Sequence, residues 1–407
     1  MNLISLLSQF PRAVLLIASL VPAFATAAFS GTNFRLSAQR NSASALFGGY
    51  NSDVAMGGKF WNRETSVRGD FSGPVVREAR ILALADPDDP DNIDLYAGNL
   101  PEGARLLAVG ATAADFDVAE IKTLGAPNVL FVSHAAARGP LREILEYFPT
   151  ICWIHSRSAG VDFITSDCLA RSSALLTNAK GMYSSTLAEY SMMACSYFAK
   201  DLPRLMRQKC DNVWQKYDVL ELRGATFGVV GYGDIGRACA KLANAYGMKV
   251  VALRRNPAAS MYDPYCDKIY GMNKLDELMA ESDYILCAAP LTEATRGMVG
   301  KDAFSAVKEG AVIINVGRGP VIDEKALIMA LGSGGRLKGA ALDVTTIEPL
   351  PQDSLLWEME NVLLSPHNMD MTATFMREST QFFLEENLPR FMRELDLYNP
   401  VDKTAGY

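Results

Sequence analysis

The chain has 407 residues, of which 49% are hydrophobic and 21% are charged, and this composition is typical of a globular protein large enough for two domains. Its formal net charge of -7, with no basic run, argues against non-specific binding to nucleic acid. The seven cysteines form no CxxC pair and the three histidines no ligand-spaced cluster, so we expect free thiols in a reducing compartment and no metal site.

The start of the chain has the character of a leader, because no aspartate or glutamate occurs before residue 53. Arg12 precedes an apolar run at residues 13–21 that is followed by small residues, which predicts a secretory signal peptide at residues 1–28. The run is short for a membrane span, so we expect no membrane association of the mature form. Residues 29–73 resemble a transit peptide and a linker. Together these segments predict the bipartite leader of a plastid protein in an alga with secondary plastids, with the secretory pathway or the mitochondrion as alternatives.

A first domain is predicted at residues 74–178, where short apolar runs alternate with stretches of helical periodicity. The expected strands are residues 80–85, 105–109, 129–132, 151–154 and 175–177, and helical stretches such as 117–124 and 141–147 lie between them. Strands that alternate with helices predict a parallel sheet covered on both faces. The C-terminal stretch 372–395 is helical in pattern and rich in phenylalanine, and we expect it to pack on this first domain, which therefore also includes residues 368–407.

A second domain is predicted at residues 179–367, inserted into the first. It begins with one long helix at residues 185–208. The expected order that follows is a strand at 225–230, a glycine-rich loop, a helix at 235–246 and strands at 249–253, 284–289, 311–316, 340–344 and 362–364. This order predicts a doubly wound nucleotide-binding domain.

The glycine-rich loop reads Gly231, Tyr232, Gly233, Asp234, Ile235, Gly236, and it follows a strand and opens a helix, as a dinucleotide-binding motif requires. Gly231 allows the tight turn, Gly233 lets the backbone approach a pyrophosphate, and Gly236 lets the helix pack on the strand. The free N–H groups of the helix N-terminus would face the phosphates. We therefore expect this loop, with Asp234 and Ile235, to contact the cofactor.

The end of the second strand of this domain distinguishes the two nicotinamide cofactors. An enzyme that uses NAD usually has Asp or Glu there to bind the ribose 2′-hydroxyl, whereas this chain has Arg254 and Arg255. Two guanidinium groups suit a 2′-phosphate, which they can hold by charge-assisted hydrogen bonds. The sequence therefore favours NADP(H), with NAD as the alternative.

Three polar residues follow predicted strands in the second half of the chain: Arg318, Glu348 and His367. Arg318 could hold a substrate carboxylate by two parallel, charge-assisted hydrogen bonds. His367 could pass a proton to or from the substrate oxygen. Glu348 could hold the imidazole and raise its pKa so that it carries the proton. These groups suit the reduction of a 2-keto acid beside a nicotinamide.

Taken in order, these motifs resemble the D-isomer-specific 2-hydroxyacid dehydrogenase family from about Trp153 to the C-terminus. The stretches that carry the resemblance are the glycine-rich loop, the motif at Arg318, and residues 290–297, 339–344, 348–351 and 366–367. The resemblance implies a Rossmann cofactor domain inserted in a flavodoxin-like substrate domain, so that the fold is α/β with two doubly wound parallel sheets. It also implies a homodimer.

The resemblance extends to single residues. It implies that Arg318 binds the substrate, that His367 is the acid and base, and that Glu348 is its partner. The remaining residues that match family positions are Asp343, Thr186 and Pro290 for the cofactor, and Ser158, Ala159 and Gly160, whose backbone N–H groups would meet the substrate carboxylate.

Two positions depart from the family pattern. The family usually has an aromatic residue where this chain has Thr345, and often has Ile-Ala-Gly where this chain has residues 368–370. Both changes could reshape the substrate pocket. We therefore expect an NADP(H)-preferring reductase of a small 2-keto acid of the glyoxylate or hydroxypyruvate type, which forms a D-2-hydroxy acid. An NAD-dependent 3-phosphoglycerate dehydrogenase is one alternative, and a dinucleotide-sensing protein like the corepressors that share this fold is another.

Overall fold

The computed structural model describes residues 74–96, 100–133 and 136–404. The predicted signal peptide at residues 1–28 and the predicted leader and linker at 29–73 lie outside the described residues. The localisation inferred from them therefore stays a prediction. Within the described ranges, no helix combines the length and the apolar character needed to cross a membrane.

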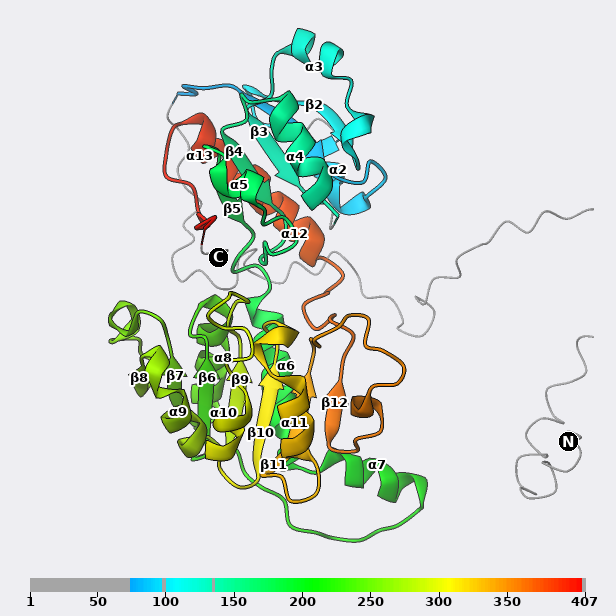
Figure 1. Ribbon diagram of the computed structural model, residues 1–407, viewed down its shortest axis with the longest axis vertical. Helices are drawn as coiled ribbons and strands as arrows, with labels where there is room; N and C mark the ends of the chain where they lie inside the picture. The colour runs from blue at the N-terminus through cyan, green and yellow to red at the C-terminus, as the bar shows by residue number, and fades with distance from the viewer. Residues whose placement is uncertain (1–73, 97–99, 134–135, 405–407) are drawn as a thin grey trace, which may run out of the picture. The chain divides into compact units, whose positions relative to one another are not determined.

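The first sheet has five parallel strands in the order β2-β1-β3-β4-β5, which is the flavodoxin-like order (Figure 1). Its strands are β1 Ala79–Leu84, β2 Ala104–Gly110, β3 Val129–Val132, β4 Trp153–Ser156 and β5 Leu175–Asn178. Every residue of β3 and β4 is buried. Buried runs of this kind are expected where helices cover both faces of a parallel sheet.

Helices from both ends of the chain cover this sheet. They are α2 Ile93–Tyr96, α3 Val118–Leu124, α4 Arg138–Tyr147, α5 Asp167–Arg171, α12 Phe375–Phe382 and α13 Leu388–Met392, with a π-helical turn, Phe383–Asn387, between the last two. On one face, Leu141 of α4 packs with Leu169 of α5 in one apolar cluster. On the other face, the ring centroids of Phe383 and Phe391 lie 5.3 and 4.9 Å from the ring centroid of Trp153. The expectation that the C-terminal helical stretch packs on the first sheet is thereby confirmed.

The second sheet has seven parallel strands in the order β12-β11-β10-β9-β6-β7-β8. Its strands are β6 Thr226–Val230, β7 Lys249–Leu253, β8 Lys268–Tyr270, β9 Tyr284–Cys287, β10 Ala311–Asn315, β11 Leu337–Leu342 and β12 Val362–Leu364. The chain runs outward from β6 to β8, then returns to β9 on the other side of β6. This reversal is the switch point at which doubly wound sheets bind their ligands.

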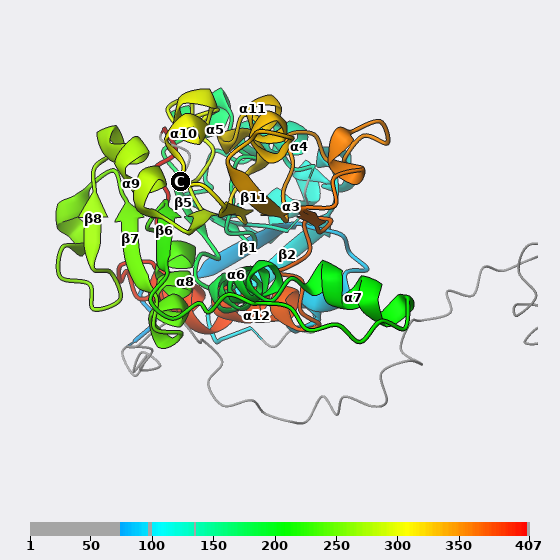
Figure 2. The same cartoon turned by 90° about the horizontal axis from the view of Figure 1, so that it is seen from below.

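The second sheet is also covered on both faces. The helices on its two faces are α6 Ser184–Ala199, α8 Asp234–Ala245, α9 Leu275–Glu281, α10 Lys301–Ala306 and α11 Glu324–Leu331. The helix α7 Leu202–Cys210 follows α6 and has no buried residue. Helices α6 and α8 pack together and share one apolar cluster with one face of the sheet (Figure 2). Helices α9, α10 and α11 contribute to the cluster on the opposite face. The predicted fold, two doubly wound parallel sheets, is confirmed, while the residue bounds of the predicted domains stay a prediction.

The predicted elements differ from the structure at one long helix, at one edge strand and at several short turns. The long helix expected at residues 185–208 is two helices, α6 and α7, because Asp201 adopts a left-handed φ of 52° between them. Its side chain then accepts a hydrogen bond from the backbone N–H of Arg204 and caps α7, whose second residue is Pro203. The short edge strand β8 was not predicted. Short 3-10 turns join other elements: η4 Pro90–Asn92, η5 Ala113–Asp115, η6 Pro257–Ser260, η7 Met272–Lys274, η8 Gly319–Val321 and η9 Leu355–Trp357.

Candidate active site

The three predicted catalytic residues follow three neighbouring strands of the second sheet. Arg318 comes after β10, Glu348 after β11 and His367 after β12, and these strands lie side by side in the order β12-β11-β10. Because the strands are parallel, their carboxyl ends meet at one edge of the sheet, which is where ligands of such sheets bind. The topology therefore brings the three residues to one edge.

Glu348 and His367 form a direct pair. Nδ1 of His367 lies 2.8 Å from Oε2 of Glu348, and the two side chains are 41% and 39% exposed. The other oxygen of Glu348 accepts a hydrogen bond of 3.0 Å from the backbone N–H of Thr345. The carboxylate is thus held from both sides, and it fixes the orientation of the imidazole.

The backbone at His367 has a left-handed φ of 51°, which is uncommon for a residue other than glycine. In this conformation its N–H donates a hydrogen bond of 2.9 Å to the carbonyl of Asp343. The buried carboxylate of Asp343 accepts further hydrogen bonds from the hydroxyl of Ser365 at 2.8 Å and the N–H of Asn368 at 3.1 Å. Asp343 therefore holds the loop that carries His367, and its predicted contact with the nicotinamide stays a prediction.

The structure brings Arg318 against the predicted substrate loop of the first sheet, residues 158–160. A Cβ atom built on Gly160 would overlap Nη2 of Arg318, so only glycine leaves room for the guanidinium there. Asp162, two residues farther along, accepts hydrogen bonds from Nη2 at 2.9 Å and from Nε at 3.2 Å of Arg318. The sequence analysis did not single out Asp162, because its partner lies 156 residues away along the chain.

The substrate loop itself is held by hydrogen bonds on both sides. The side-chain amide of Asn178 donates to the carbonyl of Ala159 at 2.6 Å, and the N–H of Ala179 donates to the carbonyl of Ser158 at 3.3 Å. Ser158 also donates its N–H to the hydroxyl of Ser156 at 3.3 Å. The loop is thus fixed at the ends of β4 and β5, and its last predicted residue, Gly160, lies beside Arg318.

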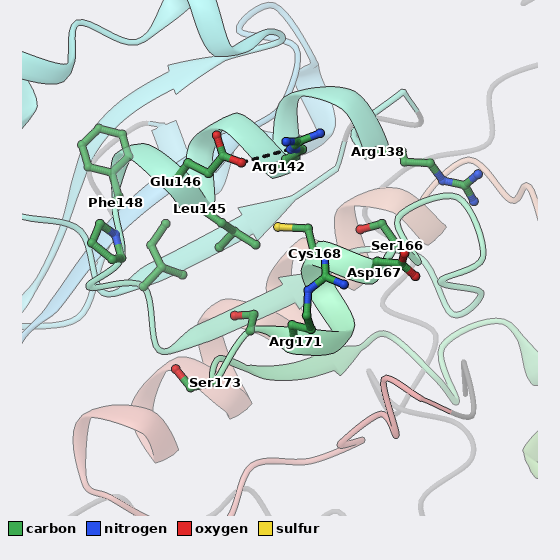
Figure 3. Close-up of a pocket in the computed structure, with 13 residues that line it drawn as sticks. Arg138, Arg142, Leu145, Glu146, Phe148, Ser166, Asp167, Cys168, Arg171 and Ser173 are labelled. Carbon is green, nitrogen blue, oxygen red and sulfur yellow. Dashed lines mark hydrogen bonds and ion pairs between the residues drawn. The ribbon is translucent and has the colours of Figure 1, made fainter.

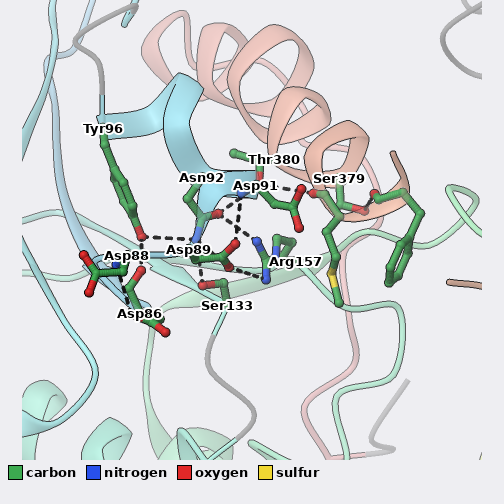
Figure 4. Close-up of polar contacts among 12 residues, drawn as sticks. Asp86, Asp88, Asp89, Asp91, Asn92, Tyr96, Ser133, Arg157, Ser379 and Thr380 are labelled. Carbon is green, nitrogen blue, oxygen red and sulfur yellow. Dashed lines mark hydrogen bonds and ion pairs between the residues drawn. The ribbon is translucent and has the colours of Figure 1, made fainter. Parts of the chain in front are cut away.

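A buried arginine that the sequence analysis did not single out precedes this loop. Arg157 forms an ion pair of 2.9 Å with Asp89 and donates a hydrogen bond of 2.9 Å to Asn92 (Figure 4). Asn92 also accepts a hydrogen bond of 3.0 Å from Thr380 of α12, and the carbonyl of Arg157 accepts one of 2.5 Å from Tyr183. The available signal was a charged residue directly after a fully buried parallel strand, the position where such sheets place ligand-binding residues.

The glycine-rich loop has the shape that a pyrophosphate requires. Gly231 has a φ of 101°, and a Cβ there would lie 2.5 Å from the backbone nitrogen of Ala289, so the turn needs glycine. A Cβ on Gly233 would meet no atom of the described residues within 4 Å, which leaves the backbone open to a ligand. Gly236 packs against the carbonyl of Gly231, and α8 begins at Asp234 with its N-terminus toward this space.

The other predicted cofactor residues surround the same switch point. Arg254 directly follows β7, and its guanidinium donates a hydrogen bond to the hydroxyl of Ser260. Arg255 is exposed. Pro290 follows β9 and is exposed. Thr186 lies partly exposed in the first turn of α6. In the same turn, the hydroxyl of Ser184 donates a hydrogen bond to the carboxylate of Asp234.

Comparison with known proteins tests the family. The sequence signature described as D-isomer specific 2-hydroxyacid dehydrogenase, NAD binding domain, matches residues 192–368. A glyoxylate reductase of Korarchaeum cryptofilum is 31% identical over 330 residues, which cover 78% of this chain and 92% of that protein. The chain belongs to the D-isomer specific 2-hydroxyacid dehydrogenase family.

Two further members of this family are similar to the chain. A D-3-phosphoglycerate dehydrogenase of Methanocaldococcus jannaschii is 32% identical over 235 residues, and the match spans only 43% of that longer protein. The crystal structure of a D-isomer specific 2-hydroxyacid dehydrogenase from Xanthobacter autotrophicus, in complex with NADPH and MES, covers 81% of this chain and 100% of its own with a TM-score of 0.68 and 27% identity. Membership of this family implies an NAD(P)-binding domain in the chain. It does not determine the substrate.

Asp370, a residue that departs from the family pattern, interacts electrostatically with the site. Burial raises the pKa of Asp370, while its electrostatic interactions with His367 and Arg318 act in the opposite direction. Asp370 is one of the three residues at 368–370 that depart from the family pattern. The departure therefore adds a carboxyl group near the catalytic residues.

A pocket lies away from this site. It has a volume of about 750 Å³ and is open to solvent between α4 and α5, and its lining includes Arg142, Glu146, Cys168 and Arg171 (Figure 3). None of the predicted site residues lines this cavity. Over the described ranges, no group of three or more His, Cys, Asp or Glu residues could hold a metal ion.

Proposed function

We propose that this chain is an NADP(H)-preferring reductase of small 2-keto acids of the glyoxylate and hydroxypyruvate type, with a D-2-hydroxy acid as the product. The observation that carries this proposal is the pair of Glu348 and His367, with nitrogen and oxygen 2.8 Å apart, on the sheet edge that also bears Arg318. An imidazole held by a carboxylate can carry a proton, and a guanidinium can bind a carboxylate.

Each residue has a distinct task in this proposal. A bound nicotinamide would supply the hydride. Because Nδ1 of His367 faces Glu348, the other ring nitrogen, Nε2, is the one that would give a proton to the substrate oxygen. Arg318 would hold the substrate carboxylate together with the N–H groups of Ala159 and Gly160, of which Gly160 lies against it, while the N–H of Ser158 is already donated to Ser156. The His367 side chain is 41% exposed, so closure over the substrate would be needed to remove water from the site.

Steady-state assays with glyoxylate, hydroxypyruvate and phosphohydroxypyruvate, each with NADPH and NADH, test this proposal. We expect turnover of one of the first two with NADPH, and a loss of about two orders of magnitude or more in kcat for His367→Ala. Preferred turnover of phosphohydroxypyruvate with NADH would instead support 3-phosphoglycerate dehydrogenase activity, the activity named for the Methanocaldococcus relative. Dinucleotide binding without turnover of any 2-keto acid would support a sensing role like that of the corepressors.

The preference for NADP(H) rests on Arg254 and Arg255, which follow β7 where an NAD enzyme usually has an acidic residue. In Arg254→Asp, we expect the ratio of kcat/KM for NADPH to that for NADH to fall at least about tenfold, because a charge-assisted hydrogen bond to the 2′-phosphate is replaced by repulsion. Arg223→Asp is the matched control, since Arg223 precedes β6 at the opposite end of the sheet and pairs with Glu221. An unchanged ratio in Arg254→Asp would show that Arg254 does not contact the 2′-phosphate.

A further inference from the structure

The guanidinium of Arg318 is already partly engaged. A guanidinium has five N–H donors. Nε and one N–H of Nη2 donate to the same oxygen of Asp162, at 3.2 and 2.9 Å, and one N–H of Nη1 donates to the carbonyl of Gly317 at 2.9 Å. Among the described residues, these three contacts leave one N–H on Nη1 and one on Nη2. Two such donors on adjacent nitrogens are what a carboxylate needs for two parallel hydrogen bonds.

We propose that Asp162 is a positioning residue for the reaction, which turns the guanidinium of Arg318 so that its Nη1–Nη2 edge is presented to the substrate carboxylate. The inference rests on the proposed function, because it assigns the substrate carboxylate to Arg318. Asp162 comes from the first sheet and Arg318 from the second. The carboxylate-binding group is therefore assembled by residues of both sheets.

Asp162 is suited to this task because its own backbone is held. Its carbonyl accepts a hydrogen bond from the guanidinium of Arg138 in α4. The preceding residue, Val161, is buried, and its carbonyl accepts hydrogen bonds from the N–H of Ile164 at 3.0 Å and the hydroxyl of Thr165 at 2.9 Å. A fixed backbone gives the carboxylate of Asp162 a defined position, which a mobile surface side chain would not have.

The pair is also accessible enough to act on the substrate rather than to stabilise the core. The side chains of Asp162 and Arg318 are 51% and 29% exposed. Exposed ion pairs contribute little to folding stability, because water screens them. Loss of the Asp162 carboxylate should therefore change the orientation of Arg318 and leave the fold intact.

Two variants of Asp162 test the proposal. In Asp162→Ala, we expect KM for the 2-keto acid to rise tenfold or more, and to rise by a larger factor than kcat falls, because a saturating substrate carboxylate restores the orientation. Asp162→Asn keeps an oxygen that can accept both hydrogen bonds, so KM should stay within about threefold of the wild type. Asp167→Ala is the control, since this exposed carboxylate five positions away lines the cavity of Figure 3.

A second measurement separates this proposal from the proposed function. Phenylglyoxal modifies accessible guanidinium groups, and peptide mass spectrometry can follow its reaction with Arg318 in the full chain without any substrate. We expect Arg318 to react at least about threefold faster in Asp162→Ala than in the wild type or in Asp162→Asn, because a charge-assisted contact is lost. Equal reactivity in all three proteins, or an unchanged KM in Asp162→Ala, overturns the role of Asp162. Absence of turnover in the wild type overturns the proposed function alone, and the labelling then decides on Asp162.

Discussion

At the scale of single residues, the site depends on a glycine that makes room for a charged group. A Cβ atom at Gly160 would overlap Nη2 of Arg318, the end of a flexible side chain. In Gly160→Ala, we therefore expect the guanidinium to move away while the backbone stays in place. KM for the 2-keto acid should rise about tenfold or more, and the thermal midpoint of unfolding should change little.

The matched control for this prediction is Gly139→Ala. Gly139 lies in α4 of the same sheet, and a Cβ there would meet none of the described atoms within 4 Å. Alanine is favoured over glycine inside a helix, so this variant should be as active and at least as stable as the wild type. If Gly160→Ala and Gly139→Ala have the same KM, the close approach of Arg318 to the substrate loop has no part in substrate binding.

At the scale of elements, the buried ion pair of Arg157 and Asp89 joins the end of β4 to the segment after β1 (Figure 4). The two side chains are only 7% and 17% exposed, so removal of one partner leaves a buried charge without compensation. We expect Arg157→Ala to lower the free energy of unfolding by about 3 to 5 kcal/mol, as measured by hydrogen exchange of the amides in β4.

Arg142→Ala serves as the control for the buried pair. Arg142 pairs with Glu146 at 3.0 Å on the surface of α4, where both side chains are more than half exposed. Water screens such a pair, so its loss should not change the exchange of β4 measurably. A similar effect of both variants on β4 would mean that the Arg157 network does not stabilise this sheet.

At the scale of the whole molecule, pH acts on stability through a histidine remote from the site. His155 of β4 is fully buried among aromatic rings, and burial lowers its pKa from 6.5 to about 3. The unfolded chain takes up a proton below pH 6.5, whereas the folded chain does so only near pH 3. The stability linked to the neutral ring is therefore complete above pH 6.5 and is lost as pH falls.

Between these pKa values the loss should be about 1.4 kcal/mol per pH unit, which amounts to about 2 kcal/mol at pH 5. Hydrogen exchange of β4 at pH 7 and pH 5, in the wild type and in His155→Gln, measures it. Glutamine does not titrate, so the variant should lose less stability than the wild type over this range. Equal losses in the two proteins would assign the pH dependence to other groups.

Much of this protein can be predicted from its sequence because its elements are locally encoded. Apolar runs of strand length alternate with stretches of helical period, and this order is enough to predict two parallel sheets. The glycine-rich loop can be located because its residues are consecutive and follow β6. Arg318, Glu348 and His367 can be placed at one edge because each follows a parallel strand of the same sheet.

The tertiary structure decided how those residues are held. Three sets of contacts join segments that are far apart in the sequence. They are the contact of Asp162 with Arg318, the support of the His367 loop by Asp343, and the network of Arg157. Such contacts depend on the strand order and on the packing between elements, which no local pattern encodes. The sequence by itself therefore determined the chemical groups and the sheet edge on which they lie, and only the packing of distant segments decided which way the guanidinium and the imidazole face.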